Sequence, residues 1–404
     1  MTDLPWWSCT AMFGGAAVLA LVCTPLALRL ARRFDFYDVP GGGKSHETPV
    51  PYLGGLAIVV SFVPVVVVAE LAVSSGHRDQ LNLAVCMAIA VALAVLGLVD
   101  DRRRLSPWPR LALEIGAGVA VWTVTSGTWL PGPQPFQAVA TVCWVVILTN
   151  AFNLLDNMDG SAAGIAAISS IFLFAVALRN GQFLLGAIAL ALAGSAVGFL
   201  PYNFHPARIY MGDSGSLFLG FLLAVLTLNL RFPTTSKPTI LVPLLLVGLA
   251  LFDTTLVTIT RLLHGRSPLQ GGLDHVSHRL VFVGLSTRGA VFLLYATSVV
   301  LGSIGLVVTA VGRSEGLALC TLAGLAVLAA GLVLAFVPVY QKNAKVETLA
   351  PEAPVRGRHQ EAGTHRRQLT AGHNASGYRP RSNDVPAFED TRRWSAMGRS
   401  RGST

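Results

Sequence analysis

Charged residues are scarce in this sequence. Asp, Glu, Lys and Arg make up 13% of the 404 residues, whereas soluble globular domains carry about a quarter. The composition therefore excludes an ordinary soluble domain. The five cysteines show no CxxC or Cys/His spacing, which excludes a disulfide framework and a zinc site. No internal repeat of fixed period is visible, and this absence disfavours transporter folds built from duplicated halves.

Apolar residues are abundant by contrast. They make up 53% of the chain, and the mean hydropathy is +0.60. They fall into blocks of roughly 18 to 24 residues, the length that a helix needs to cross about 30 Å of hydrocarbon. The sequence therefore predicts an all-α, polytopic transmembrane bundle. About eleven spans are expected, at 10–28, 53–73, 81–99, 110–126, 137–152, 160–178, 183–200, 214–230, 238–262, 288–311 and 316–339.

The first apolar block is followed by Arg29, Arg32 and Arg33 and has no evident cleavage site, so it is expected to be a retained span. Residues 1–340 are expected to form the membrane-embedded domain. Twelve of the 30 Lys and Arg residues follow Tyr340, in a segment rich in Arg, Ser, Gly and Pro. This basic segment, 341–404, is expected to be disordered and to be attracted to anionic lipid rather than to nucleic acid.

The short loops differ in charge on the two sides of the predicted bundle. One set of loops carries 13 Lys and Arg residues and the opposite set carries 5. Since the more basic loops face the cytoplasm, the N-terminus is expected outside and the C-terminus in the cytoplasm of a cell-membrane protein. The basic set comprises 29–52, 100–110, 150–160, 201–213 and 261–288.

Five polar clusters lie on this same predicted cytoplasmic side. Charged groups near membrane depth are costly and usually mark function, so five clusters on one face indicate one composite site. A transporter would instead place polar residues near the bilayer midplane and along both halves of its spans. The clusters occupy 41–55, 97–104, 150–160, 202–216 and 265–280.

Two of these clusters are rich in carboxylates and amides. The adjacent Asp100 and Asp101 repel each other unless a cation or a base offsets them, so they suit a proton acceptor or a Mg²⁺ site, or a helix end balanced by nearby arginines. Side chains bearing oxygen recur every three residues in the second cluster, as one stripe on a helix, and would fit a hard cation and a sugar or uracil ring. That stripe consists of Asn150, Asn153, Asp156 and Asp159.

The other three clusters suit phosphate groups. Asp213 precedes Ser214 and Gly215 where a span begins, so it can hold a metal at a helix N-terminus, or serve as a plain helix cap. A Gly- and Pro-rich segment brings Lys44 and His46 near an anion, although such residues are often simply solvated. The longest cytoplasmic loop carries groups suited to a diphosphate, namely Arg266, His275 and His278.

In this order, the five clusters resemble the polyprenyl-phosphate N-acetylhexosamine-1-phosphate transferase family over about residues 10 to 340. That family includes GlcNAc-1-phosphate transferases and the phospho-MurNAc-pentapeptide translocase. The resemblance implies catalytic roles for Asp100 and Asp101, a principal Mg²⁺ ligand in Asp213 and a second metal contact in Asn153. It also implies catalytic roles for Asp156 and Asp159, the acidic pair near the nucleotide, and for His275. The nucleotide-sugar contacts that it implies come from Lys44, His46 and Asn203.

Two positions depart from the family pattern. Where much of the family carries His-x-His-His, this chain reads His275-Val276-Ser277-His278, so Ser277 replaces the middle histidine. Arg104 stands where many relatives carry Lys, which preserves a substrate-binding charge but changes its geometry. These departures weaken the roles inferred for the two histidines and for Arg104.

The resemblance implies an enzyme that transfers GlcNAc 1-phosphate from UDP-GlcNAc to an undecaprenyl or decaprenyl phosphate and releases UMP. The expected cofactor is Mg²⁺, with Mn²⁺ as an alternative. The expected partners are UDP-N-acetylhexosamine, polyprenyl phosphate and membrane lipid, without nucleic acid, and a homodimer is left open. The phospho-MurNAc-pentapeptide translocase is the alternative enzyme, and a secondary transporter is the remote alternative from another class.

Overall fold

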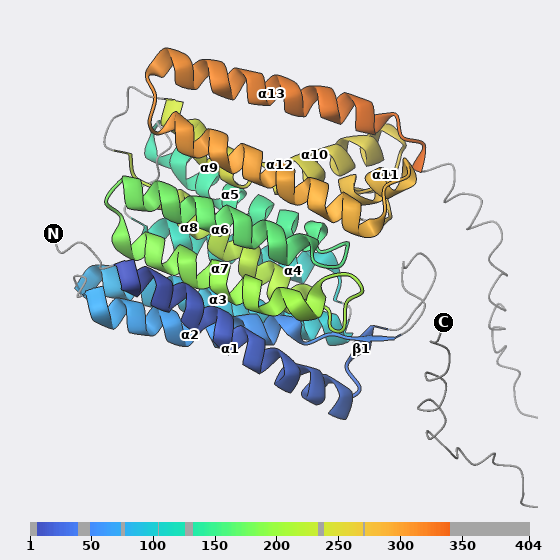
Figure 1. Ribbon diagram of the computed structural model, residues 1–404, viewed down its shortest axis with the longest axis horizontal. Coiled ribbons are helices and arrows are strands. Elements are labelled where there is room, and N and C mark those ends of the chain that lie inside the picture. The colour runs from blue at the N-terminus through green and yellow to red at the C-terminus, as the bar shows by residue number, and fades with distance from the viewer. Residues whose placement is uncertain are drawn as a thin grey trace, which may run out of the picture. The chain divides into compact units, whose positions relative to one another are not determined.

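A computed structural model of the chain describes residues 6–38, 49–73, 77–103, 105–125, 132–232, 238–269 and 271–339. Apart from one small sheet, the regular structure in these ranges is helical, which confirms the predicted all-α class (Figure 1). The sheet consists of β1 (Tyr37–Asp38) and β2 (Val50–Pro51), which pair antiparallel. The basic tail beyond Tyr340 lies outside the described residues.

The helices follow the predicted apolar blocks closely. In chain order they are α1 (Trp6–Arg33), α2 (Gly54–Val73), α3 (His77–Arg103), α4 (Pro107–Val124), α5 (Gln134–Leu155), α6 (Ser161–Arg179), α7 (Phe183–Asn203), α8 (Gly212–Leu228), η1 (Pro238–Leu241), α9 (Val242–Leu246), α10 (Gly248–Leu263), α11 (Val276–Phe282), α12 (Thr287–Val308) and α13 (Arg313–Ala335).

Within the described ranges, eight of these helices are long and apolar enough to cross a membrane, and nine qualify if one bent pair counts as a single span. Two predicted spans fall on helices outside that set. One is α4, which carries Arg110 and Glu114 in its first half, and the other is α8, which has 17 residues. The chain thus contains a multi-helix membrane bundle whose positions along the sequence match the prediction.

The ninth predicted span, 238–262, is not one straight helix. A 3₁₀ turn and α9 lead into α10 across a bend of 71°. The bend is centred on Val247, whose φ of −112° and ψ of 15° lie outside the helical region. Pro243 lacks a backbone N–H and stands where α9 begins, and Gly248 opens α10, so the continuous hydrogen-bond ladder expected from the apolar run does not form.

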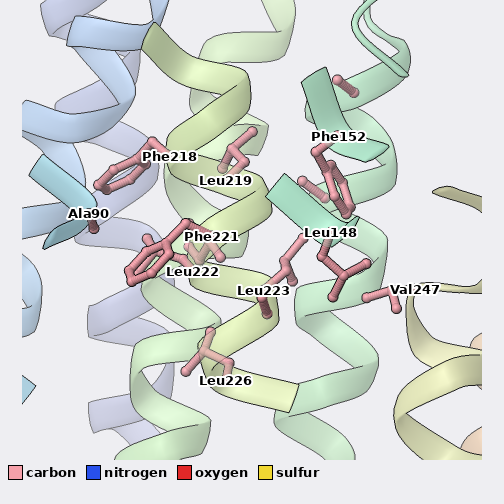
Figure 2. Close-up of a cluster of buried hydrophobic side chains, with 14 of the residues drawn as sticks. Ala90, Leu148, Phe152, Phe218, Leu219, Phe221, Leu222, Leu223, Leu226 and Val247 are labelled. Atoms are coloured by element: carbon pink, nitrogen blue, oxygen red, sulfur yellow. The ribbon is translucent and has the colours of Figure 1, made fainter. Parts of the chain in front are cut away.

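Helix α8 is the centre of the bundle. Every residue from Ser214 to Leu228 is buried, and α8 packs against α2, α3 and α5. Figure 2 shows Phe218 and Phe221 directed toward Ala90 of α3, with Leu148 and Phe152 of α5 on the other side. Since lipid tails are as apolar as these side chains, close van der Waals packing is what holds such helices together.

The crossing of α3 and α8 is unusually close at one point. A Cβ added to Gly97 of α3 would lie 2.4 Å from the carbonyl carbon and oxygen of Asp213 and from the nitrogen of Ser214. Only a residue without a side chain fits there. The glycine therefore brings the end of α3 that carries two adjacent aspartates directly against the start of α8.

The segments that carry the predicted clusters meet at one end of the bundle, beside β1 and α11 (Figure 1). Tyr52 forms a parallel β-bridge with Tyr210 and donates a hydrogen bond from its hydroxyl to the carbonyl of Asp101 at 2.5 Å. Arg288 donates to the carbonyl of His205 at 3.0 Å. These contacts join loops that are far apart in the sequence, as one composite site requires.

We expect Gly97→Ala to separate α3 from α8 and to lower the free energy of unfolding by about 1–3 kcal/mol, the usual cost of overpacking. The midpoint of thermal unfolding in detergent measures this loss. Gly116→Ala is the matched control, because a Cβ at Gly116 of α4 meets nothing within 4 Å. Equal midpoints for the two variants would show that the close crossing does not matter.

Candidate active site

The carboxylate of Asp101 caps the N-terminus of α8. One of its oxygens accepts a hydrogen bond from the backbone N–H of Asp213 at 2.9 Å, and the other accepts from the N–H of Ser214 at 3.4 Å. The first backbone N–H groups of a helix lack partners within the helix and attract negative charge. Gly212 has a φ of +71°, and a Cβ there would lie 2.5 Å from the Asp101 carboxylate. Asp101 therefore holds the first turn of α8, which carries Asp213, against the end of α3.

Arg110 of α4 lies between two carboxylates from different helices. Its guanidinium is 3.4 Å from Asp100 at the end of α3 and 3.4 Å from Asp213 at the start of α8. Asp100 also accepts a hydrogen bond from the N–H of Leu105 at 2.7 Å. A planar guanidinium can contact two oxygen acids at once, which a Lys ammonium does less well. Arg110 thus joins α3, α4 and α8 at one point.

The polar row of α5 continues this network. Asn150 accepts a hydrogen bond from Arg110 at 3.4 Å and donates to Glu114, which is fully buried. Asn153 donates to Asp213 at 2.7 Å and to the hydroxyl of Ser216 at 3.0 Å. The first two members of the predicted stripe therefore face α4 and the aspartate of α8.

Asp156 lies just after the last residue of α5, and its carboxylate accepts no hydrogen bond from any described residue. Its pKa is raised to about 8, first because burial penalises the charged form and then because the negative charges of Asp213, Asp101 and Asp159 act in the same direction. Asp156 thus belongs to the same acidic centre. Among the described residues, no cation offsets this repulsion.

Asp159 and Asn203 make their hydrogen bonds within the turn after α5 and the loop before α8. The Asp159 carboxylate lies 2.8 Å from a ring nitrogen of His205 and accepts the N–H of Ala207 at 2.9 Å. Asn203 is 2% exposed, and its amide accepts from the N–H of Gly160 and donates to the carbonyl of Ile209, both at 3.1 Å. Both side chains hold the turn after α5 against the loop before α8, so they stabilise the backbone next to the site.

The loop between α10 and α11 is built around buried ion pairs. Arg261 is 2% exposed and makes two hydrogen bonds, at 2.8 and 2.7 Å, to the carboxylate of Asp274. Arg279 is fully buried and donates to the carbonyls of Asp274 and Leu334. This network positions the histidines of the loop. Arg266, which the sequence offered as a diphosphate ligand, is half-buried in the same loop.

His275, which precedes α11, and His278, in its first turn, face different partners. His275 is 3% exposed and its Nδ1 lies 2.7 Å from the carboxylate of Asp253 on α10. His278 contacts the hydroxyl of Ser277 at 3.3 Å through Nδ1. Ser277 in turn donates to the side-chain oxygen of Asn157 at 2.5 Å. The serine that replaces a histidine of the family pattern therefore docks the loop onto the turn beside Asp156.

Comparison with known proteins identifies the family of the chain. The profile of Glycosyl transferase family 4 matches residues 83–231, a range that contains Asp100, Arg110 and Asp213. A probable undecaprenyl-phosphate N-acetylglucosaminyl 1-phosphate transferase of Bacillus subtilis is 33% identical over 292 residues, or 68% of this chain and 78% of the relative. A decaprenyl-phosphate N-acetylglucosaminephosphotransferase of Mycobacterium leprae is 31% identical over 312 residues, or 69% and 78%.

The chain belongs to glycosyl transferase family 4. The family predicted from the sequence is thereby confirmed, and the transporter alternative falls away. A phospho-N-acetylmuramoyl-pentapeptide-transferase of Streptococcus thermophilus is also similar, at 26% identity over 319 residues, or 72% of this chain and 93% of that protein.

Within this member of the family, sequence reasoning missed Arg110 as a site residue. In the sequence, Arg110 contributes only to the charge of the loop 100–110. The available signal was its spacing of four residues from Glu114, which puts both side chains on one helix face, where they form an ion pair of 3.6 Å. Three predicted residues, Lys44, His46 and Arg104, lie outside the described residues.

The donor set fits a hard divalent cation in its chemistry. Asp213, Asn153 and Asp156 offer carboxylate and amide oxygens, which Mg²⁺ prefers, and the surrounding carboxylates exceed the positive charge of Arg110. In the described part of the chain, no three His, Cys, Asp or Glu side chains are already arranged around one point as metal ligands. A cation would therefore draw these oxygens together and compete with Arg110 for Asp213.

We expect Arg110→Gln to leave Asp100 and Asp213 without their shared counter-charge and to lower the free energy of unfolding by about 1–3 kcal/mol, less than for a fully buried pair. The unfolding midpoint in detergent should fall, and millimolar Mg²⁺ should recover part of the loss. Arg103→Gln, which removes an exposed arginine, is the control. A midpoint equal to that of the control would contradict the bridging role.

His278 gives a pH dependence of stability. Burial lowers its pKa from 6.5 to about 4, so the unfolded chain binds the proton more readily between these values. The contribution of His278 to stability is therefore complete above about pH 6.5 and decreases as the pH falls toward 4, by about 1–2 kcal/mol at pH 5.

The variant His278→Gln should lose this dependence, as measured by the unfolding midpoint between pH 5 and pH 8. His264→Gln, which replaces an exposed histidine of the same loop, should retain it. A wild-type curve with the same pH dependence as that of His278→Gln would disprove the assignment.

Proposed function

We propose that this chain transfers N-acetylglucosamine 1-phosphate from UDP-N-acetylglucosamine to a polyprenyl phosphate and releases UMP, the initiating step of a cell-envelope glycan. Membership of glycosyl transferase family 4 supports a transferase of this kind. Two relatives, 33% and 31% identical, carry the names of N-acetylglucosamine phosphate transferases acting on undecaprenyl or decaprenyl phosphate.

The observation that carries the proposal is the meeting of Asp100, Arg110 and Asp213 from three helices, at contacts of 3.4 Å. A phosphoryl transfer requires positioning and charge neutralisation far more than covalent chemistry from the protein. One guanidinium set among carboxylates, at the end of an apolar bundle, offers both. The guanidinium can bind a phosphate oxygen, and the carboxylates can orient it or bind a cation.

In the proposed reaction, an oxygen of the polyprenyl phosphate attacks the β-phosphorus of the nucleotide sugar. A new P–O bond forms, the bond from the β-phosphorus to the bridging oxygen breaks, and UMP leaves with that oxygen. Asp100 would orient the acceptor phosphate beside Arg110. Asp101, through its hydrogen bonds to the start of α8, would hold Asp213 in place while the charge moves.

We propose Mg²⁺ as the cofactor, with Asp213, Asn153 and Asp156 as its ligands. When bound, the cation would neutralise the diphosphate and polarise the phosphorus that is attacked. The amide nitrogen of Asn153 donates to Asp213 at 2.7 Å, so the two side chains are adjacent, and the amide would turn its oxygen toward the cation to bind it. Mn²⁺, which accepts the same oxygen ligands, is the alternative cation.

The same proposal includes an orientation in the cell membrane. Eleven spans, with the N-terminus outside, would put the acidic centre at the cytoplasmic face, where UDP-sugars are made. The charge difference between the two sets of loops, 13 against 5 Lys and Arg residues, supports this orientation. A polyprenyl chain would then lie in the inner leaflet with its phosphate beside α3 and α4.

The peptidoglycan translocase remains the second candidate. Its support is the similarity to the Streptococcus thermophilus enzyme, at 26% identity. The higher identity to N-acetylglucosamine phosphate transferases, 33% and 31%, favours the first candidate. The two candidates differ in the donor, so one assay separates them.

The decisive measurement is the release of labelled UMP by the purified, full-length protein with polyprenyl phosphate and a panel of UDP-sugars, with and without Mg²⁺. We expect release with UDP-N-acetylglucosamine and Mg²⁺. Release only with UDP-MurNAc-pentapeptide would support the translocase, and no release with any donor would refute both candidates.

In the same assay, Asp213→Asn should abolish transfer while the protein still inserts in the membrane, because the carboxylate shared by Asn153 and Arg110 is lost. Asp100→Asn and Asp101→Asn should each lower kcat by about 100-fold or more, the scale on which electrostatic groups act. Asp38→Asn, outside the acidic centre, is the control. Full activity in Asp213→Asn would remove the metal assignment.

A further inference from the structure

Ser277 occupies the position where the family pattern has a histidine, and its hydroxyl contacts two side chains. It lies 2.5 Å from the side-chain oxygen of Asn157 and 3.3 Å from Nδ1 of His278. The hydroxyl has a single proton, which it donates to one of these two side chains. That choice determines which ring nitrogen of His278 carries the ring proton, and the orientation of Asn157 decides it.

The amide of Asn157 is oriented by a third contact. Its Nδ2 group donates to the backbone carbonyl of Leu154 at 2.7 Å. A carbonyl oxygen only accepts, so the amide nitrogen must face Leu154, and the amide oxygen must face Ser277. That oxygen also only accepts. The hydroxyl of Ser277 must therefore donate its proton to Asn157.

With its proton used in this way, the Ser277 oxygen can only accept a hydrogen bond from His278. Nδ1 of His278 is therefore the donor and carries the ring proton. Since burial lowers the pKa of His278 to about 4, the ring is neutral near pH 7 and has one proton. The other nitrogen, Nε2, is left with a lone pair. The hydrogen bond of one ring nitrogen thus sets the state of the other.

Nε2 of His278 is buried and has no hydrogen-bond partner among the described residues. A buried polar atom without a partner is costly and usually indicates a missing ligand or water. A bare lone pair repels phosphate oxygens, which are also acceptors. The contact of the preceding residue, Ser277, with Asn157 ties the start of α11 to the turn that carries Asp156, so the part of α11 that carries this ring docks next to the acidic centre.

We propose that Ser277 is a positioning residue that holds His278 in its Nδ1–H tautomer, so that Nε2 accepts a hydrogen bond from an N–H or O–H group of the nucleotide sugar. This inference rests on the proposed function for the identity of the ligand. It replaces the diphosphate contact expected of His278 from the sequence. The donor group belongs either to the sugar, as a hydroxyl or the acetamido N–H, or to the uracil ring.

The tautomer can be read directly from full-length protein carrying ¹⁵N-labelled histidine rings, in detergent at pH 8. The His278 signals are assigned by their loss in His278→Gln. In the wild type we expect a protonated Nδ1 and an unprotonated Nε2. Ser277→Ala should shift the proton toward Nε2, and Ser277→Thr should restore the wild-type state. Ser286→Ala, which removes the serine cap of α12 without touching either histidine, is the matched control.

A proton on Nε2 in the wild type, or the same tautomer in the wild type and in Ser277→Ala, would overturn the assignment. Adding each of two ligands then identifies the group that donates a hydrogen bond to Nε2. A change of the Nε2 signal with UDP as well as with UDP-N-acetylglucosamine assigns the donor to uracil, and a change only with the latter assigns it to the sugar. No change with either, at concentrations that saturate binding, refutes the ligand role.

Kinetics provide an independent readout. Ser277→Ala should raise KM for UDP-N-acetylglucosamine about fivefold to tenfold, the effect of one weakened hydrogen bond, with kcat within about twofold. Ser277→Ala combined with Asn157→Ala should be no worse than Asn157→Ala alone, because both act through one contact. A fall in kcat without a change in KM would contradict the proposal. If no UDP-sugar releases UMP but the tautomer results hold, the proposed function fails and the Ser277 assignment stands.

Discussion

The site depends on one interaction, the pair of hydrogen bonds from the start of α8 to the carboxylate of Asp101. A helix that begins inside a membrane protein exposes N–H groups that neither lipid nor its own turns can satisfy. Asp101 satisfies two of them, at Asp213 and Ser214. Because the cap comes from α3, the same contact fixes the distance between α3 and α8. Gly97 and Gly212 provide the space in which this cap can form.

The position of α8 also determines the electrostatics of the site. Asp100, Asp156 and Asp213 are brought together at the end of an apolar bundle, where like charges repel strongly because water screens them poorly. Arg110 compensates two of these carboxylates. The centre retains an excess of negative charge. This excess is what supports the proposed cation, and in the proposed reaction the Arg110 guanidinium would pass from carboxylate to phosphate.

Buried charged side chains also hold the loop between α10 and α11 together. Arg261 and Arg279 are buried among backbone carbonyls and Asp274, so a long irregular segment has a rigid interior. That rigidity allows a single hydroxyl, that of Ser277, to join the loop to the turn after α5. The acidic centre and the histidines are thereby parts of one assembly, although about 120 residues separate them in sequence.

The sequence by itself determined the membrane class, the order and positions of the helices and the set of carboxylates, because apolar length and the cost of charge in lipid are local properties of the chain. It could not distinguish Asp100 from Asp101, which are adjacent and alike. Only the tertiary structure decided that one faces Arg110 while the other caps α8, since that depends on which helix crosses α3. The bend at Val247, the supporting role of Asn203 and the partner of Ser277 were decided in the same way, by contacts between segments that the chain brings together only when it folds.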